Sequence, residues 1–293
     1  METLCTRDNI RIIFHNATSK ASTSCKEKQV LLDPNCKTAV ITGGAEGIGL
    51  ATAHQLLCAK AQNVALLGLD AEVGLEAVNI LNCSYGKDKA AFYKCDVRCK
   101  GEVEDALQRV KADYNKIDIL VNAAGIWNDA VWEQEVQTNL VGTINTNLAA
   151  KEYIDRGSGV VINIAGNLGL HVFPPSPTMS ALQSGIIKFS QGLGHDLNYR
   201  KIGIRIIVLC PGITQTKFIQ EAEERTLMPE MSKDLEEFLK RAHRQKPEVC
   251  GKSVIELIKY GPTGSTWVIE GSNLFYLDFP GWKNYCSLIS QFT

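Results

Sequence analysis

Short apolar runs alternate with stretches of helical spacing along most of the chain. The predicted strands are 38–41, 64–67, 91–95, 117–121, 160–164, 204–209 and 266–270, with a further extended run at 273–277. The predicted helices are 71–82, 101–115, 130–155 and 180–199, and one more follows residue 49. Strands that alternate with helices are typical of a parallel sheet. The pattern therefore predicts an α/β fold of Rossmann type, with a doubly wound parallel sheet of about seven strands in a single domain.

The stretch Thr42–Gly49 carries the clearest chemical signal. It reads TGGAEGIG, follows the first strand of the alternating pattern and leads directly into the helical sequence Leu50–Leu57. Glycines let the backbone turn tightly and approach phosphate groups, and the N–H groups at the start of the next helix can bind them. A glycine triplet can also be an ordinary turn. The flanking strand and helix favour a dinucleotide pyrophosphate site.

The two ends of the chain differ from the region between them. Residues 1–35 are rich in polar side chains and lack the apolar core of a signal peptide, which predicts a partly ordered or flexible N-terminal extension. Its short run Ile10–Phe14 is apolar enough to dock on the domain. We assign 36–279 to the Rossmann domain and 280–293 to a C-terminal tail.

Composition and charge narrow the function classes. The formal net charge of −1 argues against a nucleic-acid partner or an anionic membrane surface. No apolar run reaches the roughly 18 residues that a membrane span needs. The ten cysteines form no CxxC motif and no zinc-type cluster with histidines, so we expect no metal. Reduced, mostly buried thiols in a cytoplasmic protein are the expectation.

Several motifs occur in an order and spacing that resemble those of the classical short-chain dehydrogenases. They are the glycine turn, Asp96-Val97, Asn122-Ala123-Ala124-Gly125, Asn139 with Gly142, and Pro211-Gly212. The likeness spans about residues 36–279. It is strongest to the insect alcohol dehydrogenases and the NAD-dependent 15-hydroxyprostaglandin dehydrogenases, through the runs 210–216 and 264–269. The resemblance implies an oxidoreductase fold that binds a dinucleotide and a small-molecule ligand in one cleft.

The resemblance also assigns cofactor roles. The turn glycines would hold the pyrophosphate, Asp96 would accept from the adenine amino group, and Val97 would lie against the adenine ring. Asn122 and Gly125 would line the adenosine ribose side, and Ile213 with Thr214 would meet the nicotinamide carboxamide. The candidate cofactor-binding residues are Gly43, Glu46, Gly47, Ile48, Gly49, Asp70, Asp96, Val97, Asn122, Ala123, Gly125, Pro211, Gly212, Ile213 and Thr214.

One determinant of cofactor choice is altered. Relatives that prefer NAD carry an aspartate at the end of the second strand, and that position is Gly68 here. Asp70 follows two residues later and could substitute at a longer reach. Glu46 stands where NADP-dependent relatives often carry a basic residue, so it would repel a 2′-phosphate. We therefore predict NAD, bound more weakly than in intact relatives.

The catalytic positions depart from the family pattern of serine, tyrosine and lysine. Alignment of the strand 160–164 and of Pro177 places these positions at Gly166, Met179 and Gln183. Glycine has no hydroxyl to stabilise an alkoxide, a thioether has no exchangeable proton, and an amide has no charge to lower a phenol pKa. Asn139, the fourth member, which holds a water in the family's proton relay, is retained.

Two hypotheses follow. The first is a pseudoenzyme, which would be a binding protein or the partner subunit of a related dehydrogenase. The second is an NAD-dependent alcohol or 15-hydroxyprostaglandin type oxidoreductase with a non-standard proton donor. His171 is the one plausible acid–base group near these positions, although an ordinary loop histidine is the blander interpretation. The Tyr85–Lys89 spacing matches a Tyr-xxx-Lys pair by chance, because it precedes a strand far from the nicotinamide end.

Two regions bear on ligands and assembly. The charged segment Lys217–Val249 fits helices that cover a substrate, or equally a solvated amphipathic surface. Apolar positions on the helices 130–155 and 180–199 suggest a homodimer, or a heterodimer with a related dehydrogenase. Packing against the sheet explains part of the same pattern.

Overall fold

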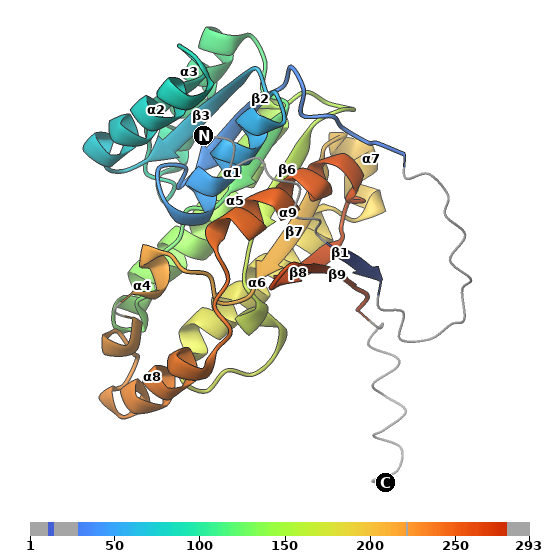
Figure 1. Ribbon diagram of the computed structural model, residues 1–293. Helices are drawn as coiled ribbons and strands as arrows, with labels where there is room; N and C mark the ends of the chain where they lie inside the picture. Colours follow the sequence, from blue (N-terminus) through green and yellow to red (C-terminus); the bar gives the residue numbers. More distant parts are fainter. Residues whose placement is uncertain (1–10, 15–28, 221, 280–293) are drawn as a thin grey trace, which may run out of the picture.

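A single sheet forms the centre of the structure, a computed structural model that describes residues 11–14, 29–220 and 222–279. The strand order is β1-β9-β8-β7-β6-β5-β2-β3-β4 (Figure 1). The predicted α/β fold is confirmed, and the strands that the sequence predicted all form. They are β2 (Thr38–Thr42), β3 (Asn63–Gly68), β4 (Ala90–Lys94), β5 (Ile119–Asn122), β6 (Val160–Ile164), β7 (Arg205–Pro211) and β8 (Thr266–Glu270).

The sheet of the described residues has nine strands, close to the about seven expected. The extended run predicted at 273–277 is β9 (Asn273–Leu277), which runs antiparallel to β8. On its outer side β1 (Arg11–Phe14) pairs in parallel with β9, so this part of the N-terminal extension does dock on the domain. The outer edge of β9 carries backbone N–H and C=O groups that need partners, and four extended residues are long enough to supply them. The rest of 1–28 and the tail 280–293 lie outside the described residues.

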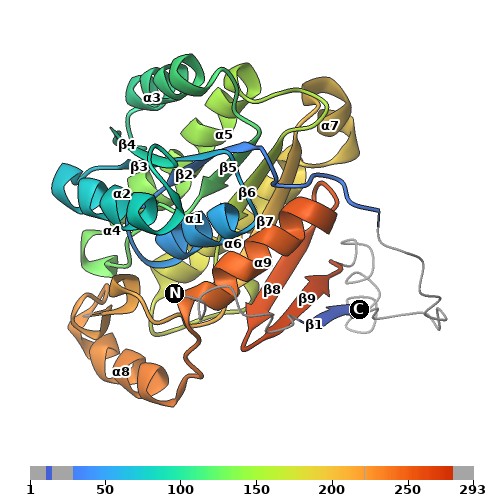
Figure 2. The same ribbon diagram turned by 45° about the horizontal axis from the view of Figure 1, so that its top comes forward.

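Helices cover both faces of the sheet (Figures 1 and 2). One face packs against α1 (Gly47–Cys58), α2 (Ala71–Tyr85) and α9 (Pro247–Tyr260). The other packs against α3 (Lys100–Tyr114), α5 (Gly142–Tyr153) and α6 (Pro177–Leu193). Strands buried from both sides explain why their sequences are continuous apolar runs.

The remaining helices refine the predicted boundaries. The single helix predicted at 130–155 is α4 (Trp132–Glu135), a π-helical turn at Val136–Val141, and α5. The helix predicted at 180–199 begins at Pro177 and ends before Gly194, after which α7 (Asp196–Ile202) follows. α8 (Ser232–Arg241) lies away from the sheet in the lower left of both views (Figures 1 and 2). The sequence pattern missed α9, which packs along α1.

The strand order reverses beside β2, which has β3 on one side and β5 on the other. At this point the loops after β2 and β5 diverge to opposite faces, so a crevice forms at the carboxyl ends of the strands. The Thr42 hydroxyl ties the two loops together by accepting the backbone N–H groups of Ala123 and Ala124, each at 3.2 Å. The fold therefore places the glycine turn at the mouth of this crevice.

The cysteines depart from the expectation of reduced, mostly buried thiols. Cys58 is disulfide-bonded. Of the free thiols in the described part of the chain, Cys95, Cys210 and Cys250 are buried, whereas those at positions 36, 83 and 99 are exposed. Within the same residues, no helix combines the length and apolar character that crossing a bilayer requires.

Candidate functional site

A cavity of about 330 Å³ opens at the carboxyl edge of the sheet, within the size range of small-molecule sites. It unites the predicted phosphate and catalytic residues. Fourteen of the predicted site residues line it: Glu46, Gly47, Ile48, Gly49, Ala123, Gly125, Asn139, Gly166, Met179, Gln183, Pro211, Gly212, Ile213 and Thr214. The structure does not bring Gly43, Asp70, Asp96, Val97 or Asn122 to its lining.

The glycine turn has the backbone that a phosphate site needs. Gly43 and Gly47 adopt φ values of +62° and +53°, which side chains disfavour. A Cβ on Gly49 would lie 2.1 Å from the Gly43 carbonyl oxygen, so the turn has no room for one. α1 begins at Gly47, and the Glu46 side chain caps none of its N–H groups. These N–H groups are therefore available to an anion.

An ion pair joins the glycine turn to the segment after β7. The Lys217 ammonium bonds the Glu46 carboxylate, which raises the Lys217 pKa. Both side chains are exposed, so the pair contributes little stability. The pair partly neutralises Glu46, so its expected repulsion of a 2′-phosphate stays a prediction.

Gly166, Met179 and Gln183 meet at one side of the cavity, which we call the floor. Gly166 follows β6, and the other two lie one turn apart on α6. The Gln183 Nε2 group donates to the Met179 sulfur at 3.1 Å, and a Cβ on Gly166 would lie 3.4 Å from Gln183 Cδ. Gln183 is 7% exposed, and its Oε1 atom has no hydrogen-bond partner among the described residues. The floor thus presents a buried acceptor that a ligand could satisfy.

Met179 also belongs to a small apolar core beside the cavity. This core contains Trp127, Phe173 and Met179, together with Leu235 and Leu239 from α8. Met179 is 1% exposed. The side chain at the family's tyrosine position therefore packs α8 onto the domain. The predicted covering segment is attached here by buried apolar contacts.

The Asn139 side chain makes two hydrogen bonds to the backbone of Ile126. Its Oδ1 accepts the Ile126 N–H at 2.8 Å, and its Nδ2 donates to the Ile126 carbonyl at 2.7 Å. Both bonds hold the loop after β5 against the π-helical turn that carries Asn139. An amide has two donor hydrogens and two acceptor lone pairs, so these two bonds leave capacity for a water, and the predicted relay role of Asn139 stays a prediction.

A buried polar network that no sequence motif indicates supports the same loop. The Trp127 indole donates to Ser176 Oγ at 2.9 Å, and this hydroxyl donates to Asp129 Oδ1 at 2.7 Å. Burial raises the Asp129 pKa despite these bonds. Glu135 accepts the Asn128 N–H at 2.9 Å, and burial raises its pKa to about 7, with the nearby Asp129 charge adding to the shift.

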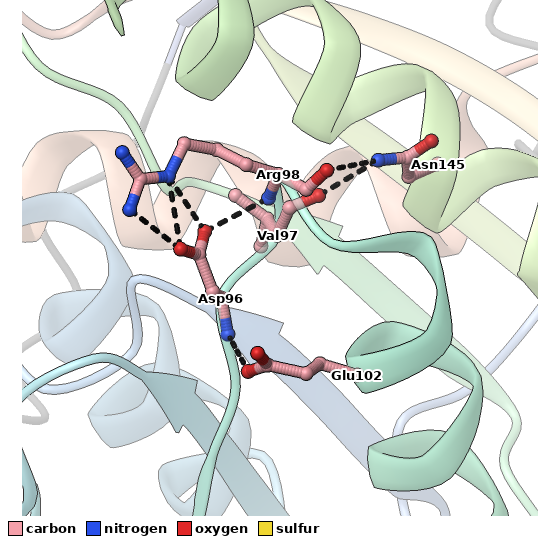
Figure 3. Close-up of polar contacts among 5 residues, drawn as sticks. All are labelled: Asp96, Val97, Arg98, Glu102 and Asn145. Atoms are coloured by element: carbon pink, nitrogen blue, oxygen red, sulfur yellow. Dashed lines mark hydrogen bonds and ion pairs between the residues drawn. The ribbon is translucent and has the colours of Figure 1, made fainter.

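The predicted adenosine residues have other partners. The Asp96 carboxylate binds the Arg98 guanidinium (Figure 3). Asp70 caps α2 by accepting the N–H groups of Glu72 and Val73 at 2.9 and 3.2 Å, so the helix orients its side chain. Asn122 is buried and donates to Asn163 Oδ1 at 2.8 Å. These three side chains are therefore already engaged within the protein.

Ionisable side chains are sparse in the cavity lining that the structure describes. They are Glu46, Lys217 and Arg225. The first two pair with each other. His171 is exposed and lies outside the lining, as does Tyr85, whose hydroxyl lies 3.4 Å from the His54 ring. No three His, Cys, Asp or Glu side chains in the described ranges form a group that could hold a metal.

Several lining residues escaped the sequence-based prediction. They are Ala124, Ile126, Trp127, Ile164, Ala165, Asn167, Leu168, Ile186, Thr216, Lys217, Phe218, Ile219 and Arg225. Most lie in loops just after β5, β6 and β7. Position after a parallel strand was a usable signal, because these ends meet at one edge of the sheet. The apolar side chains among them could not be told from core residues.

Comparisons with known proteins agree with this geometry. A family model described as short chain dehydrogenase matches residues 37–227. Alcohol dehydrogenase 1 of Ceratitis cosyra is 32% identical over 243 residues, covering 81% of this chain and 93% of that protein. The NAD(+) 15-hydroxyprostaglandin dehydrogenase of Rattus norvegicus is 33% identical over 198 residues, covering 66% and 74%. The crystal structure of levodione reductase has a similar fold, with a TM-score of 0.70 at 22% identity over 81% of this chain and 97% of that one.

Proposed function

The chain belongs to the short-chain dehydrogenase family, and from this premise we propose that it binds NAD without catalysing the family's usual reaction. In this proposal it is a pseudoenzyme that acts as an NAD-responsive or ligand-binding protein, or as the partner subunit of an active relative. The cofactor, when bound, supplies a nicotinamide ring that can exchange a hydride. What the chain does not supply is the proton transfer that must accompany it.

The residues present fit a dinucleotide at its central and nicotinamide parts. The uncapped N–H groups at Gly47 suit the pyrophosphate. The unpartnered Gln183 Oε1 suits a ribose hydroxyl, which would satisfy an acceptor that is otherwise buried at a cost. Ile213 and Thr214 line the same cavity after β7, where the family binds the carboxamide. The fit is poorer at the adenosine ribose, since Gly68 offers no carboxylate.

The composition of the floor carries the proposal that turnover is lost. Met179 and Gln183 touch each other where the family needs a phenol and an ammonium group. Neither can release a proton, and Gly166 has no hydroxyl to stabilise an alkoxide. Loss of a general acid–base group costs on the order of 10²–10⁴ in rate. Loss of an oxyanion donor costs about 10²–10³.

A second candidate is an NAD-dependent oxidoreductase that acts on a hydroxyl or carbonyl substrate with a different proton donor. Family membership favours it, since the named relatives are dehydrogenases. His171 would be that donor. Its exposed position outside the cavity lining gives it no contact from which to act.

Calorimetric titration with NAD and NADP, together with a turnover assay over secondary alcohols, tests the proposal. We expect NAD to bind, more weakly than to intact relatives, and no turnover. Gly47→Asp should abolish binding by placing a negative charge at the helix N-terminus, whereas Gly47→Asn is the matched neutral control; both residues tolerate the positive φ. Ordinary dehydrogenase rates that disappear in His171→Ala would establish the second candidate instead.

We propose further that the protein is a dimer through the outer faces of its α4–α5 and α6–α7 helices. Trp132 on α4 is 46% exposed and Leu148 on α5 is 49% exposed, and such apolar surface favours burial in an interface. Light scattering should report a dimer that Leu148→Lys weakens. Leu75→Lys, at an equally exposed leucine on α2, should leave it intact. A monomer at micromolar concentration refutes this assembly.

A cytoplasmic location is also a proposal. Free thiols at Cys36, Cys83 and Cys99 are exposed, and exposed free thiols persist in reducing compartments. The disulfide at Cys58 is uncommon there. Cell fractionation, with alkylation of free thiols in intact cells, would show whether the protein lies in a reducing compartment or in one that permits disulfides.

A further inference from the structure

The carboxylate expected to recognise adenine is already bound within the protein (Figure 3). Arg98 Nε donates to both Asp96 oxygens at 2.9 Å, and Nη2 donates to Oδ2 at 2.6 Å. The backbone N–H of Arg98 adds a further bond to Oδ1 at 2.9 Å. Planar, bidentate pairing of this kind is the strongest form of the arginine–carboxylate contact. It holds the Asp96 pKa below its usual range.

The loop that carries this pair is fixed independently of the arginine side chain. The Cys95 N–H bonds the Gly68 carbonyl at 2.9 Å, so the loop begins at the edge of the sheet beside the end of β3. Asn145 Nδ2 on α5 donates to the carbonyls of Val97 and Arg98 at 2.9 and 3.2 Å. Figure 3 shows the Asn145 contacts on the opposite side of the loop from the ion pair. Removal of the guanidinium should therefore leave the Asp96 backbone in place.

A free carboxylate at this position would distinguish between purines. It accepts a hydrogen bond from the amino group on carbon 6 of adenine, and it repels the carbonyl oxygen that hypoxanthine carries there. In this protein four hydrogen bonds from three donor groups of Arg98 occupy both carboxylate oxygens, and the guanidinium neutralises the charge. We infer that Arg98 suppresses the reading of the base by Asp96, so that the site accepts a dinucleotide whether carbon 6 bears an amino or a carbonyl group.

The Arg98 side chain, at the adenosine end, can bind a base without distinguishing one base from another. A guanidinium group can stack on any aromatic ring, and the Arg98 side chain is 35% exposed. Stacking of this type tolerates every base because each has a π-face. This inference rests on the proposed function, since it presupposes that a dinucleotide occupies the cleft. Arg98 is thus assigned as a residue that sets cofactor specificity.

Calorimetry with NAD and with nicotinamide hypoxanthine dinucleotide tests the inference by binding alone. The unmodified protein should bind the two within about threefold of each other. Arg98→Met keeps the length of the side chain and the backbone N–H bond to Asp96 but frees the carboxylate. This variant should prefer NAD by about tenfold or more, as expected for one hydrogen bond to a charged group.

Two further variants separate the cause from its alternatives. Asp96→Asn combined with Arg98→Met should lose the preference again, because an amide can donate to a carbonyl or accept from an amino group. Arg109→Met removes an arginine that lies over the Tyr93 ring, and it should behave like the unmodified protein. A strong preference for NAD in the unmodified protein, or none in Arg98→Met, overturns the inference while leaving NAD binding established. Binding of neither dinucleotide overturns the proposed function and the inference with it.

Discussion

The glycine turn and the cavity floor both depend on glycine, but for different physical reasons. At the turn, a Cβ on Gly49 would lie 2.1 Å from a carbonyl oxygen, and a Cβ on Gly43 would lie 2.8 Å from Ala124 Cα. At the floor, the three atoms nearest to a Cβ on Gly166 belong to the Gln183 side chain, the first at an ordinary contact distance of 3.4 Å. Gly166 also has an extended backbone, with φ at −162°, that any residue can adopt. The fold demands glycine at the turn and only permits it at the floor.

This difference decides what each region reports about function. A turn that cannot hold a side chain keeps its glycines for the sake of the fold, whether or not a cofactor binds there. At the floor the fold leaves room for a Cβ at Gly166, so glycine there is not a steric requirement. The floor residues are therefore the stronger evidence on catalysis, and the turn is the weaker evidence on NAD.

Restoring the floor should give the largest effect. Gly166→Ser, Met179→Tyr and Gln183→Lys together return a hydroxyl, a phenol and an ammonium group to the cavity. We expect NAD-dependent alcohol oxidation at least ~10²-fold above the unmodified protein, because a positioned acid–base group is worth about 10²–10⁴. Each single reversion should do little, since these groups act as a unit. Initial rates with secondary alcohols provide the measurement.

Met179→Tyr needs its own control, because Met179 is also part of the apolar core under α8. Met179→Phe adds nearly the same bulk without a hydroxyl. If the triple variant is folded and binds NAD but stays as inactive as its phenylalanine counterpart, the cavity has diverged from alcohol chemistry. The ligand would then belong to another class.

The second prediction compares the two glycine sites directly. Gly49→Ala should destabilise the protein by about 3 kcal/mol or more, since the backbone must shift to accept the methyl group. Gly166→Ala should change the free energy of unfolding by less than about 1 kcal/mol, and a small gain is expected because alanine restricts the unfolded chain. Urea unfolding measures both. Equal losses at the two positions would mean that the floor is as sterically constrained as the turn.

Most of the fold followed from periodicity, and its departures have local causes. Strands buried on both faces read as apolar runs, so β2 to β8 and even β9 were found. The run Ile10–Phe14 was expected to dock on the domain but not to form a strand, because β1 forms by pairing with the edge of β9. The π-helical turn at Val136–Val141 was invisible because its sequence has ordinary helical character. Tertiary contact decided both cases.

The site divides in the same way. The floor was predictable because Gly166, Met179 and Gln183 stand at fixed spacings from recognisable flanks. The hydrogen-bond partners of the site side chains were not predictable. Spacing cannot reveal that Asp96 is bound by Arg98, or that the Asn139 side chain serves Ile126. Sequence located the groups, and only the structure showed which of them are already occupied.

The last prediction concerns the protonation of a buried carboxyl group beside the floor. The loop beside the floor depends on buried Glu135, whose pKa is raised to about 7 from 4.5, chiefly by burial. Between these values the folded protein holds a proton that the unfolded chain releases, so stability falls as pH rises through this window and levels off above about 7. The loss is about 3 kcal/mol for a shift of this size.

Glu135→Gln keeps the acceptor for the Asn128 N–H and should abolish this part of the decline. Its free energy of unfolding should therefore exceed that of the unmodified protein most at pH 8. Urea unfolding from pH 4.5 to 8.5 measures the difference, with Glu133→Gln, at an exposed glutamate of the same helix, as the control that should show none. A pH-independent difference between the glutamine variant and the unmodified protein would mean that Glu135 is ionised in the folded state, and that the loop is held by a charge rather than by a neutral acid.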